Sequence, residues 1–317
     1  MDAPYRRTFR LKYPKGFDGY PCIVARGLDQ AIVCDWSGDI SLLDLRRKSI
    51  VKSENVSWVF KGQRLGCMTL SSLQVEPESG HSCVVATRGG YAALWKLETS
   101  EVCKMHPDTG PVNAVAFSPD GTRLAIGTGY YNLSPGRVVR PTIEVWSLSD
   151  TEPIRQMSTT LPGVCVDTIL WDSDYDRIVC MTGDESQASG YLCCLDGNSL
   201  RSLCLDGIPL ADVSRILAMG QSYLVAHGKG IHAFDRDDFS PKWTHTESVE
   251  IADLAFDEGA ELLFFSGTTF LTTDGEVVGK VESPDAVCSI APKPGGGFLC
   301  VSKEGVVTAW DSVEGSE

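Results

Sequence analysis

The feature that most constrains the fold is a set of short strand-like segments that recurs along the chain. Residues 111–149 contain two apolar segments joined by a Ser-Pro-Asp-Gly turn, then a long insertion, and then a third segment ending on Trp146. Weaker copies of this set recur at a spacing of roughly 35–45 residues, which is within the range of repeat architectures. A unit of this kind cannot bury its own apolar face, so successive units must pack against one another.

Seven such sets follow one another, and no stretch shows a helical period, which predicts an all-β fold. The seventh set, residues 286–312, has three segments, whereas residues 5–13 hold a lone strand that belongs to no set. The other six sets have four segments each and span residues 21–53, 67–105, 111–157, 164–205, 213–246 and 251–282.

The lone strand at residues 5–13 can complete the seventh set as its outer strand. Pairing the two ends of the chain in this way closes a ring of sheets and leaves only short, protected strand edges. The sequence therefore predicts a seven-bladed β-propeller of four-stranded antiparallel blades, in which the N-terminal strand completes the last blade and closes the ring. We expect residues 1–317 to form a single domain of this kind.

Two of the sets resemble repeats of the WD-repeat family. Residues 112–129 (VNAVAFSPDGTRLAIGTG) and 142–148 (TIEVWSL) match the repeat almost position by position, and residues 298–311 keep Ser302 and the dipeptide Trp310-Asp311. The family's His–Asp–Ser/Thr–Trp hydrogen-bond network is complete in no set, and four sets replace its tryptophan. The replacements are Leu43, Cys194, Phe234 and Thr273 or a neighbour of Thr273. The resemblance implies a divergent propeller that acts as a non-catalytic binding scaffold.

The composition favours an intracellular protein. The formal net charge is −14, and no apolar run reaches the ~18 residues that a membrane-spanning helix needs. The first residues lack an apolar core of signal-peptide length, so we expect a cytoplasmic protein that does not use a membrane. Reduced, buried thiols are expected rather than disulfides or metal ligands, because most of the cysteines lie inside strand-like segments. These include Cys34, Cys83, Cys180, Cys288 and Cys300.

No motif for catalysis occurs in the sequence, which lacks a nucleotide-phosphate loop, HExxH and Gly-x-Ser-x-Gly. His227 and His232 are close across a Gly-Lys-Gly turn, and we interpret them as polar turn and strand residues rather than as a zinc site. We predict no catalytic residue, no cofactor and no metal. The alternative is a propeller enzyme or small-molecule binder, quinoprotein-like or lactonase-like, with its site at the central channel. It is motivated by units such as residues 38–51 and 230–245, which are similar to the repeats of pyrroloquinoline-quinone-type propellers.

Three long loops form the candidate binding site, because rigid scaffolds usually display function on loops. The family resemblance implies that these loops open on one face and belong to neighbouring blades, so they would cluster there. They are residues 53–66 with Trp58, Phe60, Lys61 and Arg64, residues 129–141 with Tyr130, Tyr131, Arg137 and Arg140, and residues 183–190 with Asp184 and Glu185. Aromatic and arginine side chains are enriched at binding hot spots. The alternative is that Trp58 and the tyrosines pack back over their own blades.

These loops predict a protein or peptide partner. Their basic side chains would form a local positive surface on an acidic chain, which suits an acidic or phosphorylated segment. We expect a monomeric propeller that acts as a scaffold or adaptor subunit of a hetero-complex. The net charge of −14 argues against nucleic acid as the partner, because phosphate binding depends on lysine and arginine.

Overall fold

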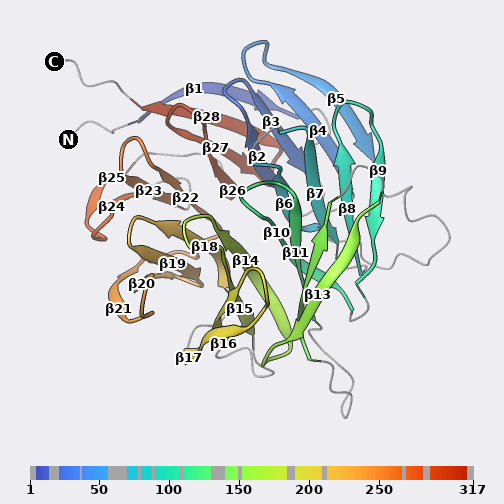
Figure 1. Cartoon of the computed structure of the whole chain (residues 1–317). Coiled ribbons are helices and arrows are strands. Elements are labelled where there is room, and N and C mark those ends of the chain that lie inside the picture. Colours follow the sequence, from blue (N-terminus) through green and yellow to red (C-terminus); the bar gives the residue numbers. More distant parts are fainter. Residues whose placement is uncertain are drawn as a thin grey trace. The chain divides into compact units, whose positions relative to one another are not determined.

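The computed structural model describes most of the chain, and every structural statement below concerns that part. The regular secondary structure of this part is entirely β, in strands β1 to β28 (Figure 1). No helix there is long and apolar enough to cross a membrane. The described residues are 5–13, 21–35, 38–55, 70–77, 80–87, 90–107, 110–129, 140–148, 152–183, 190–208, 213–265, 269–280 and 286–312.

The chain divides into two compact units, which are described separately. The first comprises Met1–Ser57 and Met219–Glu317, and the second comprises Trp58–Ala218. The strands form seven four-stranded sheets, as the repeat count predicts. Three sheets lie in each unit, and the seventh has its first strand at the boundary between the units. That all 317 residues form a single domain stays a prediction.

The first unit holds three complete sheets and most of a fourth. One sheet has β2 (Cys22–Arg26), β3 (Gln30–Cys34), β4 (Asp39–Asp44) and β5 (Ser49–Asn55). The next has β22 (Leu254–Asp257), β23 (Leu262–Phe265), β24 (Thr269–Thr272) and β25 (Val277–Lys280). The third has the order β1 (Tyr5–Lys12), β28 (Val306–Ser312), β27 (Phe298–Ser302) and β26 (Val287–Pro292). The boundary sheet has β18 (Val213–Met219), β19 (Ser222–His227), β20 (Gly230–Asp235) and β21 (Pro241–Thr246).

The second unit holds three sheets, each formed by consecutive strands. The first has β6 (Leu70–Val75), β7 (Ser82–Thr87), β8 (Tyr91–Lys96) and β9 (Val102–Met105). The second has β10 (Val112–Phe117), β11 (Arg123–Thr128), β12 (Thr142–Ser147) and β13 (Ile154–Thr160). The third has β14 (Cys165–Asp172), β15 (Arg177–Gly183), β16 (Gly190–Asp196) and β17 (Ser202–Ile208).

Strand β11 shows how a repeat unit becomes buried on both faces. Leu124 and Ile126 pack in one apolar cluster with Leu94 of the β6–β9 sheet. Ala125, which points to the opposite face, packs in another cluster with Trp171 of the β14–β17 sheet. The middle sheet of the unit is therefore covered on both sides by its neighbours, so its second strand is apolar at successive positions.

Strand β1 supplies the fourth strand of the sheet that contains the C-terminal strands. It pairs antiparallel with β28 from Tyr5 opposite Ser312 to Lys12 opposite Val306. Figure 1 shows the two strands, at opposite ends of the colour scale, lying side by side. This pairing confirms that the N-terminal strand completes the last sheet.

A one-residue register shift recurs between the third and fourth strands of several sheets. In the most family-like repeat, the residue just after this shift is Trp146. The matching residues elsewhere are Leu43, Leu195, Phe234 and Leu271. Leu43 and Phe234 are as predicted, whereas Leu195 takes the place expected for Cys194. Leu271 lies two residues before Thr273, where the prediction was Thr273 or a neighbour. The β-bulge that sets the shift depends on the fourth strand, so the third strand alone does not reveal it.

The cysteines of the strands lie mainly in the core. Cys34, Cys83, Cys180 and Cys300 are buried, and Cys288 is half-buried. Burial raises the pKa of the Cys288 thiol to about 11 and that of Cys300 still further, so both stay protonated at neutral pH.

Candidate functional site

Most of the predicted site residues fall outside the described part of the chain. They are Trp58, Phe60, Lys61, Arg64, Tyr130, Tyr131, Arg137, Asp184 and Glu185. Arg140 is described: it is exposed and lies just before β12. The structure therefore bears on the predicted site mainly through the described ends of two loops, the one after β11 and the one after β15.

The loop after β11 starts at a closely packed glycine. Gly129 has a φ of 151°, and a Cβ at this position would lie 2.2 Å from the Cα of Cys165 in β14. Only glycine permits this approach. The Gly129 amide donates a hydrogen bond to the carbonyl oxygen of Pro111 (3.2 Å), and the Gly129 carbonyl oxygen accepts one from the side-chain amide of Asn113 (3.1 Å). The start of this loop is therefore fixed against its own sheet and the next one.

The same loop also returns to a fixed position. The hydroxyl groups of Thr128 and Thr142, on the two strands that flank the loop, are 2.7 Å apart and buried. The carbonyl oxygen of Pro141 accepts a hydrogen bond from the Leu161 amide (2.9 Å). Arg140 thus extends into solvent from a backbone that is held directly beside it.

The loop after β15 is held in a comparable way. Its flanking residues Gly183 and Gly190 are opposite each other in the β15–β16 pair. The Gly183 carbonyl oxygen accepts a hydrogen bond from the Val164 amide (2.8 Å). Gly163 has a φ of 89°, and a Cβ there would lie 2.4 Å from that carbonyl oxygen, so this position also requires glycine.

Cys165 lies between the starting points of both loops. It forms an isolated β-bridge with Gly129 and is opposite Gly183 in the β14–β15 pair. We call this set, Gly129, Gly163–Cys165 and Gly183, the loop base. Its geometry brings the beginnings of two predicted loops together, whereas the position of the third loop stays a prediction. A glycine at each junction between a strand and an insertion is the sequence signal that identifies such a base.

Charged groups of both signs flank the loop base. The Asp167 carboxylate is half-buried and accepts a hydrogen bond from the Cys165 thiol (2.8 Å). Arg140 is exposed at the returning end of the loop after β11. An exposed cation therefore lies next to a fixed backbone at this edge.

The two histidines that are close in sequence are also close in space. The His227 and His232 rings have centroids 4.6 Å apart, and the His232 Nδ1 atom is 3.2 Å from the Thr244 hydroxyl. Burial lowers the pKa of His232, so the neutral ring is favoured. Within the described residues, no group of three or more His, Cys, Asp or Glu side chains is placed to hold a metal ion.

The tryptophan of the most family-like repeat makes a contact that departs from the family's hydrogen-bond network. The Trp146 indole donates a hydrogen bond to the Glu144 carboxylate (3.1 Å), which is buried and 3.6 Å from the Arg155 guanidinium. The indole of this tryptophan is thus paired with a buried carboxylate of its own strand.

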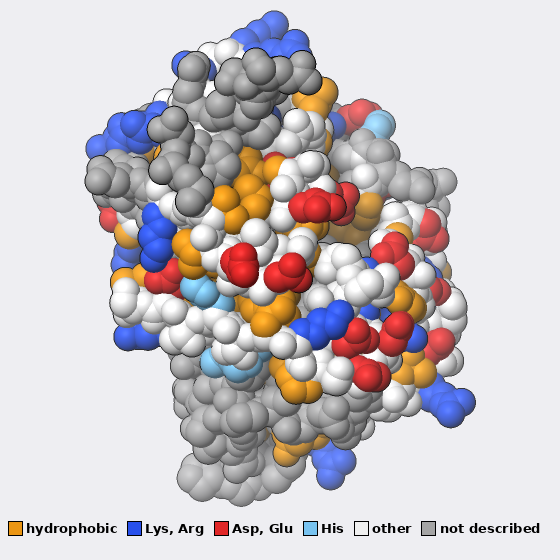
Figure 2. All heavy atoms as spheres, turned by 90° about the vertical axis from the view of Figure 1, so that its left-hand side faces the viewer, with side chains coloured by type: hydrophobic (Ala, Val, Ile, Leu, Met, Phe, Trp, Pro, Cys, Tyr) orange, Lys and Arg blue, Asp and Glu red, His pale blue; other side chains and the backbone are white. Residues whose placement is uncertain are grey.

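Charged side chains of both signs occur on the face of the molecule shown in Figure 2, where red acidic groups lie among apolar and uncharged ones.

No family model matches the chain. Similarity to known proteins is nevertheless clear over part of it. Over 162 residues, the chain is 29% identical to WD repeat-containing protein 90 of Mus musculus. This match covers 47% of this chain and 8% of the mouse protein. Over 161 residues, the chain is 31% identical to eukaryotic translation initiation factor 3 subunit I of Scheffersomyces stipitis. This match covers 46% of this chain and 44% of the yeast protein. The chain thus spans less than half the length of these curated relatives.

A solved structure matches almost the whole chain. The β-propeller domain of Myceliophteria thermophila Cps50 (Swd1) superposes on 98% of this chain and 100% of its own length, with a TM-score of 0.74. The sequence identity is 16%, so this likeness concerns the fold alone.

The seven four-stranded sheets and this structural likeness define a seven-bladed β-propeller, which confirms the predicted fold class. Over 47% of its length the chain is also similar to a WD repeat-containing protein, which supports the predicted resemblance to WD repeats.

Proposed function

We propose that this propeller is a non-catalytic, monomeric scaffold that holds a protein or peptide partner as a subunit of a hetero-complex in the cytoplasm. One similar protein is named as a subunit of eukaryotic translation initiation factor 3, another as a WD repeat-containing protein, and the similar solved structure is named as a β-propeller domain. The buried thiols of the core suit a reducing compartment. The observation that carries the proposal is the loop base, which holds the starts of two long loops together on rigid strands.

The partner proposed for these loops is an acidic or phosphorylated segment. The Arg140 guanidinium is an exposed cation at the end of one of these loops. Arg137, Lys61 and Arg64 lie on the same predicted loops. Arginine forms two parallel hydrogen bonds to carboxylate or phosphate, so it selects such groups by geometry as well as by charge. Trp58, Tyr130 and Tyr131 would supply apolar contact around that charge.

The test is capture of partners by the tagged protein, quantified by mass spectrometry, with single Ala variants of Trp58, Tyr131 and Arg140. We expect each variant to reduce one common set of partners severalfold while its melting temperature stays unchanged. Arg201→Ala is the matched control, because Arg201 is also exposed in the second unit but precedes β17 rather than a predicted binding loop. Phosphatase treatment of the lysate separates a phosphorylated partner from an acidic one. Equal capture by all variants would reject the loops as the binding site.

A further inference from the structure

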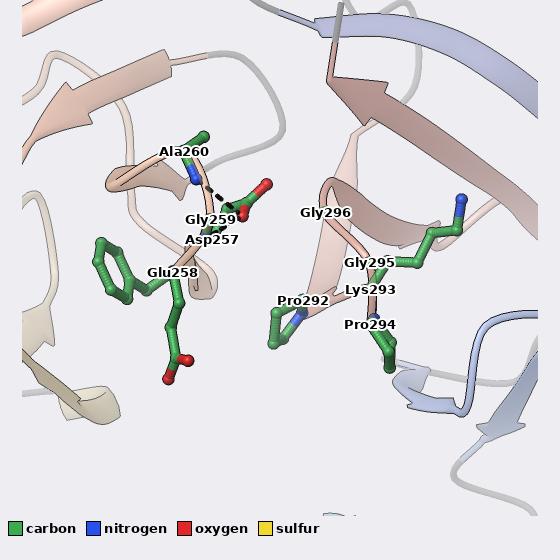
Figure 3. A pocket seen from close by; sticks show the side chains of 10 residues that line it. Asp257, Glu258, Gly259, Ala260, Pro292, Lys293, Pro294, Gly295 and Gly296 are labelled. Carbon is green, nitrogen blue, oxygen red and sulfur yellow. Dashed lines mark hydrogen bonds between the residues drawn. The ribbon is translucent and has the colours of Figure 1, made fainter. Parts of the chain in front are cut away.

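A pocket in the first unit lies between two turns that face each other, one joining β22 to β23 and the other joining β26 to β27 (Figure 3). Its volume is about 710 Å³, and its lining residues are 256–260 and 292–296. We call it the turn pocket. It is separate from the loop base, which belongs to the second unit.

One buried carboxylate holds the two turns in place. The Asp257 Oδ2 atom accepts hydrogen bonds from the Gly297 amide (2.6 Å) and the Tyr5 hydroxyl (2.9 Å). Its Oδ1 atom accepts hydrogen bonds from the amides of Gly259 (3.0 Å) and Ala260 (3.2 Å). Asp257 is therefore occupied by internal donors and fixes the shape of the pocket before any ligand binds.

The charge that faces the turn pocket is negative. Figure 3 shows Glu258 directed toward the open side of the pocket, and its side chain is exposed. Lys293 is directed away from the pocket and forms an ion pair with Asp311 of β28. An anionic ligand would meet the Glu258 carboxylate without a compensating cation from Lys293, whereas a cationic ligand would find a partner.

Apart from Lys293, the residues of the turn opposite Glu258 have small or apolar side chains. Pro292 and Pro294 are exposed, and the following Gly295 has a φ of 85°, so this turn presents rings and bare backbone. Leu28, from the turn between β2 and β3, is 57% exposed. It lies against the same turn, because a Cβ at Gly295 would be 2.9 Å from its Cδ2 atom. Leu28 thus adds an exposed apolar side chain beside the turn that lines the pocket.

We propose that the turn pocket binds an extended segment of a partner protein that carries an arginine or lysine. The cation would pair with Glu258, and neighbouring aliphatic side chains would lie on Pro292, Pro294 and Leu28. Small-molecule sites of this size usually have several polar groups that converge on the ligand, whereas Asp257 is occupied internally. A peptide suits the pocket better, because it can place a cation beside Glu258 and aliphatic side chains on the prolines and Leu28.

The experiment uses the full chain and a defined probe, a fluorescein-labelled ten-residue peptide in which arginine and leucine alternate with glycine and serine. A matched peptide carries glutamine in place of arginine. We expect fluorescence anisotropy to show weak binding of the arginine peptide. Glu258→Gln should weaken it about threefold to fivefold, as expected for a solvent-exposed ion pair, and Glu258→Lys about tenfold or more.

Glu250→Gln and Glu250→Lys are the matched controls, because Glu250 is another exposed carboxylate of the first unit that does not line the pocket. They should leave the affinity within a factor of two. Pro294→Ser tests the apolar wall, because it removes the ring without adding charge, and it should weaken binding of the arginine peptide. Equal affinity for the two peptides, equal effects at Glu258 and Glu250, or no binding by the folded protein would each overturn the proposal.

This inference concerns a surface other than the predicted loops, so the two proposals fail independently. Loss of partner capture in the Trp58, Tyr131 and Arg140 variants leaves peptide binding at the turn pocket unaffected. Conversely, a Glu258 variant that still captures partners but no longer binds the arginine peptide assigns the effect to the turn pocket alone.

Discussion

His232 shows how the position of one side chain makes stability depend on pH. Its ring is half-buried beside His227, and its Nδ1 atom lies next to the Thr244 hydroxyl. Burial lowers the pKa of His232 below its usual value of about 6.5 because the charged ring loses hydration. Burial, followed by the nearby Lys104 charge, lowers the pKa of His106 in the same direction.

The linkage predicts a loss of stability in mild acid. Between the lowered folded pKa and the unfolded value of about 6.5, the unfolded chain binds more protons than the folded one. This contribution is therefore fully present above pH 6.5 and declines as the pH falls below that value. We expect a lower melting temperature at pH 5.5 than at pH 7.5, and a smaller difference in His232→Asn. A variant with an unchanged difference would show that His232 does not contribute.

Strand β22 connects neighbouring sheets through carboxylates at both of its ends. Asp257 is its last residue, and Asp253 directly precedes its first residue. Asp253 Oδ2 accepts hydrogen bonds from the Ser289 hydroxyl and the Ile290 amide, each at 2.9 Å. The Ser289 hydroxyl oxygen also lies 3.4 Å from the Ile23 amide, which donates to it. Hydrogen bonds thus run from the β22–β25 sheet through β26 to β2.

Removing this connection should destabilise the protein more than a surface change does. We expect Asp253→Ala to lower the free energy of unfolding by about 2–3 kcal/mol, because it leaves buried donors without an acceptor. Ser289→Ala should cost about 1 kcal/mol, and the double variant less than the sum, since the two residues share one hydrogen bond. Urea unfolding measures all three, with Glu250→Ala as an exposed control. Strict additivity would contradict the proposed coupling.

In the whole molecule, the first described strand and the last belong to one sheet. Tyr5 of β1 is 3% exposed and lies in an apolar cluster with Phe270 of β24 and Phe298 of β27. Its ring is stacked on Phe270 at a centroid distance of 4.9 Å, and its hydroxyl donates to Asp257. Strand β1 therefore contributes both a paired backbone and an anchoring side chain.

This arrangement predicts that β1 can be supplied as a separate peptide. A chain that starts at residue 14 should expose the edge of β28, self-associate and melt at a lower temperature. A synthetic peptide of residues 1–13 should restore the monomer, because it adds the missing strand. The same peptide with Tyr5→Ala should bind at least tenfold more weakly. Light scattering and calorimetry measure these outcomes, and equal rescue by both peptides would reject Tyr5 as an anchor.

The strands could be predicted from the sequence because each is a short apolar or alternating segment between turn residues. The place of β1 could be predicted because the seventh set has three segments where the others have four. The roles of Asp253, Asp257 and Tyr5 could not be predicted, since each acts across sheets whose neighbouring turns are distant in sequence. Cys194 was predicted to take the place of the repeat's tryptophan, but that place belongs to Leu195. The register shift between β16 and β17 determines this, and it depends on a bulge in β17 that the sequence of β16 does not reveal. The predicted site residues sit on loops, and of these the structure describes Arg140.

The pairing of β1 with β28 also has a consequence for how the chain is made. During synthesis, Tyr5 leaves the ribosome about 300 residues before Ser312, which at 5–20 residues per second is a delay of roughly 15–60 s. Throughout that interval, β1 has an unpaired edge and Tyr5 lacks the aromatic cluster on β24 and β27. The nascent chain therefore carries β1 without its partner strand until residues 306–312 have been synthesised.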